Sequence, residues 1–524
     1  MEKFSVMNMT RTLRSLAVAV GLVLSAASPV RPDPPDLESS AAKVPPSALP
    51  KAVPLPDRET WDILTLQGAR VGHAHTVMRN VMEAGRKFVK IEVTSHLVIK
   101  RFGQTSKQNI RYTGTETPDG KLIEYTAEIQ QGPIPMLTTG RVVEDKLEVV
   151  TTTLGKKTAR SIPWSPDDGG FYAAEQTMLY RPMKPGERRF VRALEPTLNQ
   201  VITHDMVAKD YEPVDLLGGK YNLLRIDSAM RLPGGVILET TIWTNQAGET
   251  MKTLLEAMDI ETIRSTKELA LDETDLLKVD LGTDAAVKID EPLSRAHDTR
   301  RVRYTVRLEG SDPAEVFASG ASQQVKSTGK ETAELTVYAL RPGRPDGNPD
   351  AADDPPTDDD RQPNNFVQSD HEKIVAMAKE AAGDETDPWQ VALKLERYVN
   401  ETITEKNFSQ AFATAAEVAE DPTGDCSEHA VLLIALARAR GIPARAAVGL
   451  VYMQGRQAFG YHMWTEVYVQ RRWIPLDATL AQGGIGAAHL KLAHSNLKGA
   501  SAYTSFLPVM RVIGRLKVEI DEVE

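Results

Sequence analysis

The chain has 524 residues and a single cysteine, Cys426, and its formal net charge is −10 at pH 7. This length predicts two or three domains, because about 150 residues form a typical domain. An acidic surface repels phosphates, which argues against nucleic acid and anionic membranes as partners. With no second cysteine, Cys426 cannot form a disulfide within the chain, so packing, metal binding or chemistry must account for it.

The amino terminus has the order of segments that is typical of a secretory signal. Lys3, Arg11 and Arg14 precede the apolar run Leu16–Leu24, and small residues follow it. We expect this signal at residues 1–28. The apolar run is too short to cross a bilayer, which takes about 20 residues. We therefore expect an exported protein, in the periplasm, the cell envelope or the medium, with no membrane contact beyond the signal; a retained anchor is the alternative.

The long region at residues 58–285 has the pattern of an antiparallel β domain. A proline-rich linker at residues 29–57 precedes it, and such a composition favours an extended spacer. Apolar and polar residues alternate at 88–94, which predicts a strand. The turn signals Pro118–Gly120 and Pro233–Gly235 each lie between two strand-like runs. Each of them predicts a hairpin.

Two features outside the segment around Cys426 could in principle bind metal ions. His73 and His75 would share one face of a strand, but no third ligand is nearby, so we expect two half-exposed strand histidines. Residues 343–369 are rich in aspartate and proline. Because they lack the closing glutamate of a calcium loop, we expect a solvated linker there.

A smaller β module is expected at residues 286–342, where apolar residues alternate with polar ones from 301 to 308. The tail at residues 496–524 ends in the same alternation and predicts a last strand that pairs with a β module. Between the Asp-rich linker and the tail the pattern changes to helix. A capped segment at 371–382 and a second one that begins at Pro388 lead toward Cys426.

Residues 423–445 predict a helix that carries Cys426 in its first turn. Thr423 or Asp425 can cap it, the middle is apolar on nearly all sides, and a glycine and a proline end it. The unpaired N–H groups and the positive end of the helix dipole favour a thiolate, so we expect a lowered thiol pKa, opposed by Asp425 and Glu428. A buried, inert cysteine is the alternative.

A thiol nucleophile needs a base, and His462 is the best-placed histidine. It belongs to a strand-like run in which alternation puts His462, Trp464 and Glu466 on one face. His429 lies on the helix of Cys426, beside the thiol rather than across a cleft, so a packing or supporting role is expected. His489 and His494 follow the last convincing strand, and we expect both at the surface.

Asp477 is the acid expected to orient His462. A turn near residues 470–471 would place residue 478 or 479 opposite His462 in a hairpin. In the latter register Asp477 is a diagonal neighbour on the same face, at roughly 7 to 8 Å along the backbone, which an imidazole and a carboxylate can bridge. The alternative is an acid that ends the strand and caps the next turn.

Four motifs now stand in order along the chain. They are Gly424-Asp425-Cys426, Gly441-Ile442-Pro443-Ala444-Arg445, His462-Met463-Trp464-Thr465-Glu466, and Trp473 with Asp477-Ala478-Thr479. Together they resemble the core motifs of the transglutaminase-like superfamily, over residues 370–495. Members of that family commonly carry proline where Ala478 stands and a small residue where Met463 stands. These two departures concern the shape of the pocket and remove no catalytic atom.

The resemblance implies a papain-like fold in which a helix with the nucleophile packs on an antiparallel sheet with the base and the acid. By that resemblance Cys426 is the nucleophile, His462 the general base and Asp477 the orienting acid. The implied reaction is acyl transfer from a protein or peptide amide through a thioester to water or an amine, with the backbone N–H of Cys426 as an oxyanion donor. No cofactor and no metal is expected. The residues expected to line the cleft or support the site are Trp464, Glu466, His429 and Trp473, with a core position for Trp464 and a structural role for Glu466 as the alternatives.

The sequence thus predicts an α+β protein, with a C-terminal papain-like transglutaminase core preceded by a large antiparallel β-rich region. The predicted units are the signal at 1–28, the linker at 29–57, the β domain at 58–285, the β module at 286–342, the linker at 343–369, the catalytic domain at 370–495 and the tail at 496–524. Two other functions stay open. One is a secreted β-rich binding or scaffold protein with an inactive cysteine domain. The other is a Cys/His/Asp metal site that His429 would complete.

Overall fold

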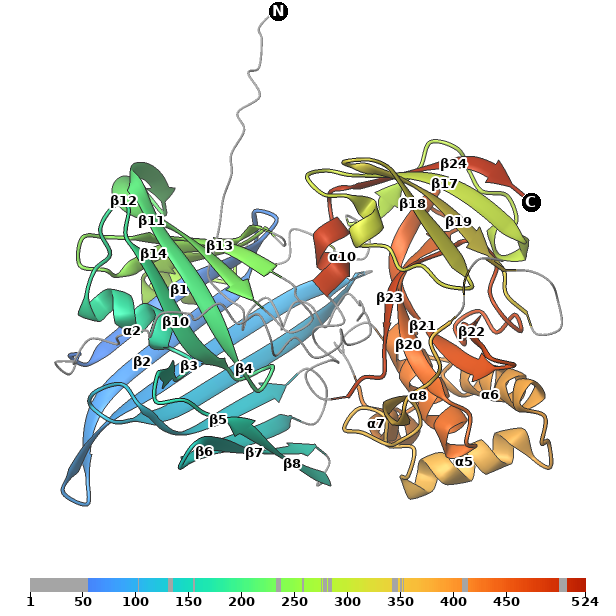
Figure 1. Cartoon of the computed structure of the whole chain (residues 1–524), viewed down its shortest axis with the longest axis horizontal. Coiled ribbons are helices and arrows are strands. Elements are labelled where there is room, and N and C mark those ends of the chain that lie inside the picture. Colours follow the sequence, from blue (N-terminus) through green and yellow to red (C-terminus); the bar gives the residue numbers. More distant parts are fainter. Residues whose placement is uncertain are drawn as a thin grey trace, which may run out of the picture.

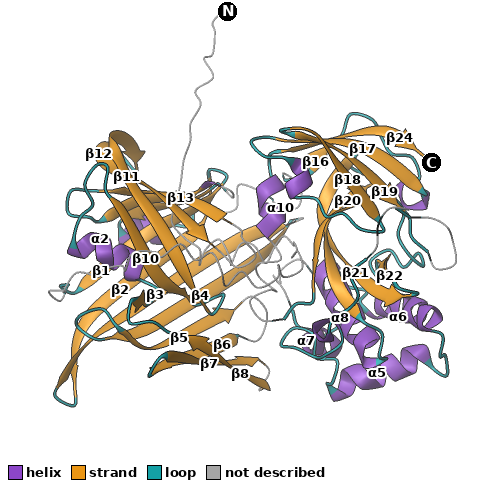
Figure 2. Ribbon diagram, viewed as in Figure 1, coloured by secondary structure: helices purple, strands orange, loops and turns teal. Residues whose placement is uncertain are grey.

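The computed structural model describes residues 55–524 except for short segments at 102, 131–134, 154–155, 232–236, 257–258, 275, 277–279, 281–284, 342–346, 349–350, 352, 408–412 and 499–506. The expected signal, most of the first linker and the turn Pro233–Gly235 lie outside the described residues. An N-terminal lobe dominated by strands lies beside a C-terminal lobe of strands and helices (Figures 1 and 2). Within the described ranges, no helix is long and apolar enough to cross a membrane.

One 15-stranded sheet builds the N-terminal lobe. Its strands are β1 (Arg58–Leu66), β2 (Ala69–Glu83), β3 (Arg86–Arg101), β4 (Gln104–Glu116), β5 (Leu122–Gln130), β6 (Met136–Val143), β7 (Lys146–Thr153), β8 (Lys156–Pro163), β9 (Asp168–Gly169), β10 (Arg188–Glu195), β11 (Gln200–Leu216), β12 (Gly219–Arg231), β13 (Ile237–Thr244), β14 (Thr250–Leu255) and β15 (Ile260–Ser265), with the helices α2 (Ala173–Tyr180) and α3 (Lys267–Leu271). Most strands pair with their neighbours in the chain, and β1 pairs with β15. The short β9 runs parallel to its neighbour β10.

The hairpins expected in this lobe are present. Pro118–Gly120 lies in the turn between β4 and β5, which pair in antiparallel register. The strands β12 and β13 also pair in antiparallel register, and residues 232–236 between them lie outside the described residues. His73 and His75 are half-buried on β2, as expected. The imidazole of His75 lies 3.0 Å from Glu59 Oε1 and stacks on Trp61, which accounts for it without a metal.

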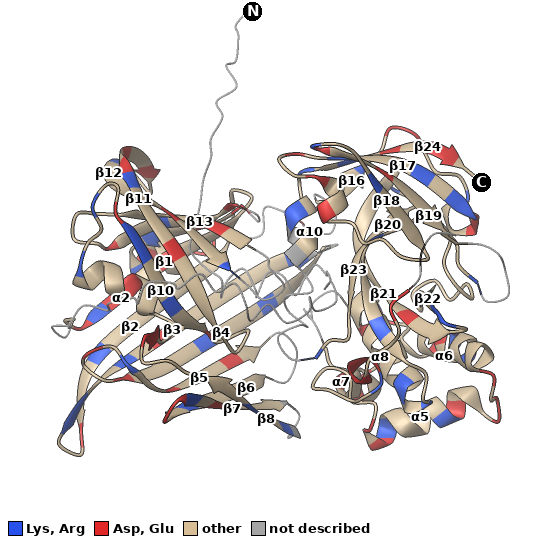
Figure 3. Ribbon diagram, viewed as in Figure 1, with Lys and Arg blue, Asp and Glu red and all other residues tan. Residues whose placement is uncertain are grey.

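A four-stranded sheet in the C-terminal lobe has the order β18-β19-β17-β24. Its strands are β17 (Arg301–Leu308), β18 (Gln323–Gly329), β19 (Thr332–Tyr338) and β24 (Leu516–Val523), with the helices η3 (Ala296–Asp298), η4 (Pro313–Glu315) and α10 (Leu507–Val512) nearby. The expected pairing of the last strand with the β module is confirmed, because β24 pairs with β17. Arginines on β17 form ion pairs with glutamates on β24, and Figure 3 marks basic and acidic positions along these two strands.

The second sheet of this lobe carries the candidate site. Its strands are β16 (Val287–Lys288), β20 (Ala444–Met453), β21 (Ala458–Val469), β22 (Arg472–Leu476) and β23 (His489–Ser495), and its helices are α5 (Glu372–Ala382), α6 (Pro388–Thr402), α7 (Ala415–Glu420) and α8 (Cys426–Ala439), with the turn η5 (Asp358–Asp360) before them. The order is β16-β21-β20-β23, and β22 also pairs with β21. Helix α8 packs on β20 and β21 and is surrounded by the other three helices. Burial of such an apolar helix contributes about 2 kcal/mol for each large side chain.

The Asp-rich segment is not a solvated linker over its described part. Asp353 accepts the backbone N–H of Trp473 at 2.8 Å and that of Ala321 at 3.0 Å. Further along, Phe366 and Val367 are buried in the core under α5 and α7. The composition was misleading because an aspartate can accept backbone N–H groups of other segments, as Asp353 does, instead of facing solvent.

Candidate active site

Helix α8 begins at Cys426 because the flanking residues fix its first turn. Asp425 Oδ1 accepts the N–H of Ser427 at 2.9 Å, and Glu428 Oε2 accepts the N–H of Asp425 at 2.9 Å. The side chain of Asp425 also accepts the backbone N–H of Glu428, so Asp425 and Glu428 form a capping box. Gly424 has φ +157°, and a Cβ there would lie 2.4 Å from Glu428 Cβ, so the position requires glycine. The Gly-Asp-Cys motif thus presents the thiol at the start of a buried helix.

The thiol of Cys426 is partly buried. The imidazole of His462 and the backbone N–H of Met463 both act on the thiol and lower its pKa. Burial first, and then the charge of Asp425, raise the pKa of the thiol, and they outweigh the charge and hydrogen bond of His462. The lowered pKa expected from the helix N-terminus is therefore wrong, because the carboxylate that caps the helix also lies beside a desolvated thiol.

His462 and Asp477 form a buried ion pair. The two groups meet at 2.7 Å between His462 Nε2 and Asp477 Oδ2. Burial alone would lower the pKa of His462, but the charges of Asp477 and Cys426 and the hydrogen bonds raise it well above its usual value. Burial would raise the pKa of Asp477, yet His462 holds it well below its usual value. The pair therefore favours the imidazolium and carboxylate forms, and Nδ1 is the ring nitrogen of His462 that does not contact Asp477.

The hairpin of β21 and β22 brings this pair together. Its turn residues Gln470 and Arg471 have φ of +50° and +64°, and Thr465 pairs with Leu476. Extending this register places residue 479 opposite His462, which is the second of the two registers predicted from the sequence. Asp477 follows the end of β22, and its Oδ1 also accepts the N–H of Thr479 at 2.9 Å. The orienting role and the turn-capping role are therefore carried by different oxygens of one carboxylate.

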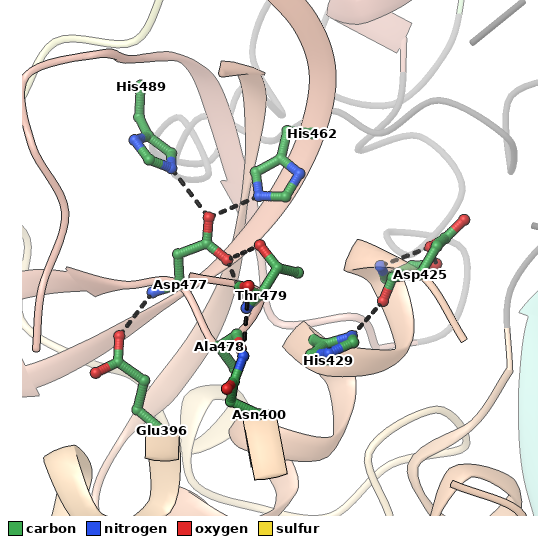
Figure 4. A network of polar contacts seen from close by, with 10 residues as sticks. Glu396, Asn400, Asp425, His429, His462, Asp477, Ala478, Thr479 and His489 are labelled. Carbon is green, nitrogen blue, oxygen red and sulfur yellow. Dashed lines mark hydrogen bonds and ion pairs between the residues drawn. The ribbon is translucent and has the colours of Figure 1, made fainter. Parts of the chain in front are cut away.

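Helix α6 supports the turn that contains Asp477 (Figure 4). Glu396 accepts the N–H of Asp477 at 3.2 Å and that of Gly483 at 3.0 Å. Asn400 donates to the carbonyl of Ala478 at 2.8 Å. Burial raises the pKa of Glu396 to about 7. Neither residue was anticipated, because nothing in the spacing of α6 indicates which loop it contacts.

His489 was expected at the surface, and this expectation is wrong. It lies on β23, fully buried, and its Nε2 is 3.1 Å from the same Oδ2 of Asp477 that His462 contacts. Burial lowers the pKa of His489 to about 4, so it is neutral at pH 7. His494 lies on the same strand, and burial holds its pKa well below the usual value. Pairing of β23 with β20 decides both positions, and β20 lies more than 35 residues earlier in the chain, so local pattern could not reveal it.

Two of the expected supporting residues lie close to the triad. His429 Nδ1 hydrogen-bonds the carbonyl of Asp425 at 2.7 Å, so His429 braces its own helix turn. Burial lowers the pKa of His429. Trp464 is 2 % exposed and stacks beside His462 with ring centroids 6.3 Å apart. Its position is that of a core residue behind the imidazole, which was the alternative to a cleft wall.

The other two supporting residues serve the surrounding structure. Glu466 forms buried ion pairs with Arg445 at 2.8 Å and Lys491 at 2.5 Å. The guanidinium of Arg445 lies 3.8 Å from the ring centroid of Trp473. The indole N–H of Trp473 donates to the carbonyl of Asp354 at 2.9 Å. These residues hold β20, β22 and the Asp-rich segment together, so their contacts are structural.

Three ligand atoms converge closely enough to hold a metal ion. Those of His462, Asp477 and His489 lie within 4.8 Å of one another, whereas His429 is not in this group. An imidazole that ligates a metal usually donates its other ring N–H to an acceptor. Nδ1 of His489 has no such partner among the described residues. The cluster therefore fits proton sharing around one carboxylate better than a dedicated metal site.

Comparison with known proteins supports the resemblance that the motifs indicate. Residues 375–478 match the sequence model of the transglutaminase-like superfamily. This region is transglutaminase-like. The match spans Cys426, His462 and Asp477, and the recognition from four motifs is thereby confirmed for this part of the chain. No curated protein matched the sequence.

Solved structures give distant likenesses. A candidate cysteine protease from Cytophaga hutchinsonii is 15 % identical over 43 % of this chain and 86 % of its own, with a TM-score of 0.26. A β-barrel-like protein of a domain of unknown function from Brucella abortus is 12 % identical over 41 % of this chain and 97 % of its own, with a TM-score of 0.30. A candidate protease from Parabacteroides distasonis is 11 % identical over 53 % of this chain and 63 % of its own, with a TM-score of 0.17. Each TM-score is below 0.5, so no conclusion rests on these pairs.

Proposed function

We propose that the protein is an exported cysteine enzyme that transfers acyl groups from protein or peptide amides through a thioester on Cys426. The observation that carries this proposal is the buried pair of His462 and Asp477, joined at 2.7 Å between Nε2 and Oδ2, together with the thiol of Cys426, whose pKa His462 lowers. A nucleophile, a base and an orienting acid in this order are the elements of covalent acyl transfer.

The chemistry follows from these groups. His462 takes the proton of the Cys426 thiol, the thiolate attacks the carbonyl carbon of the amide, and the carbonyl oxygen gains the negative charge. The N–H of Cys426 has no acceptor within the helix because it lies in the first turn, so it is available to stabilise that oxygen. His462 gives its proton to the leaving amine, and the C–N bond breaks as the thioester forms. Water or a second amine then gives a proton to His462 as it attacks the thioester carbonyl, and the C–S bond breaks to release the acid or the new amide and to regenerate the Cys426 thiolate.

Incubation with glutamine-containing peptides and a labelled primary amine tests this function. Amine incorporation would indicate transamidation, whereas free acid or cleaved peptide would indicate hydrolysis. Cys426→Ala should abolish either product, and Asp421→Asn, a change at an exposed residue of the same segment, should leave both unchanged. Absence of any product with a broad peptide pool, together with full biological function of Cys426→Ala, would instead support a binding or scaffold protein with an inactive domain.

A further inference from the structure

We infer that His489 is a positioning residue: its N–H shares the Asp477 carboxylate with His462 and so limits how strongly that carboxylate holds the His462 proton. This inference deepens the proposed function and rests on it. The geometry is direct, since both imidazoles meet one oxygen, at 2.7 Å from His462 Nε2 and 3.1 Å from His489 Nε2 (Figure 4).

The proton of His489 can be assigned. An ionised carboxylate only accepts hydrogen bonds, so the ring nitrogen that faces Asp477 must carry the proton. The other ring nitrogen, Nδ1, has no hydrogen-bond partner within the described ranges. A neutral imidazole has one N–H, and here it is the Nε2–H. His489 is thus a fixed, uncharged donor to the carboxylate of the triad.

Packing alone does not require a histidine at position 489. The side chain of His489 is fully buried, with its ring edge-on to Trp464 at 5.2 Å and 5.8 Å from the ring of His297. A buried acceptor with no donor is unfavourable, and an apolar side chain of similar size would avoid it. The hydrogen bond to Asp477 is therefore what the imidazole contributes here.

A glycine on β20, the strand between β21 and β23, leaves room for His462 and His489 to reach the same carboxylate. Gly449 lies opposite His462 on one side and opposite Lys491 on the other. A Cβ at Gly449 would lie 1.9 Å from the carbonyl oxygen of Leu490, so no side chain fits at this position. The rings of His462 and His489 can then approach to 5.9 Å between centroids.

The effect on His462 has a definite sign. Every hydrogen bond to the ionised form of Asp477 makes the carboxylate less basic. In addition to both imidazoles, the carboxylate accepts the N–H and the hydroxyl of Thr479 through Oδ1. Removal of the His489 donor leaves His462 as the only described partner of Oδ2, so the carboxylate should hold the imidazolium more tightly. His462 should then be a weaker acid toward the leaving amine.

A matched pair of variants tests this role in the full chain. His489→Gln keeps an N–H donor of similar reach, whereas His489→Met has a similar length and no donor. NMR titration with ¹³C-labelled histidine, assigned with His462→Gln, reads the apparent pKa of His462 without any substrate. We expect an upward shift of about one pH unit in His489→Met and little change in His489→Gln. For any peptide that the wild type turns over, kcat should fall several-fold in His489→Met with KM unchanged, and His489→Gln should restore it.

The outcomes distinguish the positioning role of His489 from the proposed acyl-transfer function. Equal titration of His462 in both variants, or a downward shift in His489→Met, would overturn the positioning role and leave His489 with a packing role. An unfolded His489→Met protein, detected by circular dichroism, would leave His489→Leu as the donor-free comparison. If the titration shifts as expected while Cys426 proves inert toward amides, the positioning of Asp477 stands and the acyl-transfer function fails.

Discussion

Replacement of Asp425 by asparagine should make Cys426 more reactive, although it removes a neighbouring charged group. The charge of Asp425 is second only to burial among the causes that raise the thiol pKa. Asparagine caps a helix about as well as aspartate, and its Oδ1 can still accept the N–H of Ser427, which Asp425 holds at 2.9 Å. The substitution therefore removes the charge and keeps the helix start.

The size of the effect can be worked through. Removal of a like charge at this range lowers a pKa by about one unit. Below the thiol pKa, one unit multiplies the thiolate fraction by about ten, whereas a Brønsted coefficient of about 0.45 reduces the reactivity of each thiolate about threefold. The net gain is about threefold. The assay is thiol–disulfide exchange between Cys426 and a neutral aryl disulfide near pH 7.5. The rate is measured from the absorbance of the released chromophore.

Asp421→Asn is the matched control, because it removes the same charge from an exposed residue four positions before Asp425, and its rate should equal that of the wild type. A slower rate in Asp425→Asn, with the helix intact by circular dichroism, would refute the reasoning. It would mean that the carboxylate activates the thiol instead of raising its pKa.

Two further predictions concern stability. Gly424→Ala should unfold at clearly lower temperature than the wild type, by calorimetry, because the new Cβ would lie 2.4 Å from Glu428 Cβ; an unchanged midpoint would contradict the packing at the helix start. His489 is neutral when buried, with a pKa of about 4 against about 6.5 in the unfolded chain, so its contribution to the unfolding free energy is present above pH 6.5 and is lost as the pH falls toward 4, by roughly 3 kcal/mol at the end of that range. Urea unfolding at pH 7 and pH 4.5 should therefore show a smaller loss for His489→Gln than for the wild type, and equal losses would contradict the buried neutral state.

Local pattern determined much of the site. The capped start of α8 at Cys426 depends on residues within four positions of it, and the β21 and β22 hairpin depends on a two-residue turn, so both could be predicted from neighbouring residues. The alternation at Val302, Tyr304 and Leu308 likewise predicted a strand whose apolar face is fully buried. Interactions between residues close in the chain can be predicted from the order of residue types, because helix and strand periodicity are local properties.

Tertiary structure alone decided the rest. The thiol pKa depends on how much water the folded lobe excludes from Cys426, and this is why the helix terminus by itself gave the wrong sign. The position of His489 depends on the pairing of β23 with β20, and the support of Asp477 depends on the packing of α6 against a distant turn. Desolvation and long-range strand pairing arise only when segments far apart in the chain come into contact in the folded protein. Composition does not indicate which segments these are.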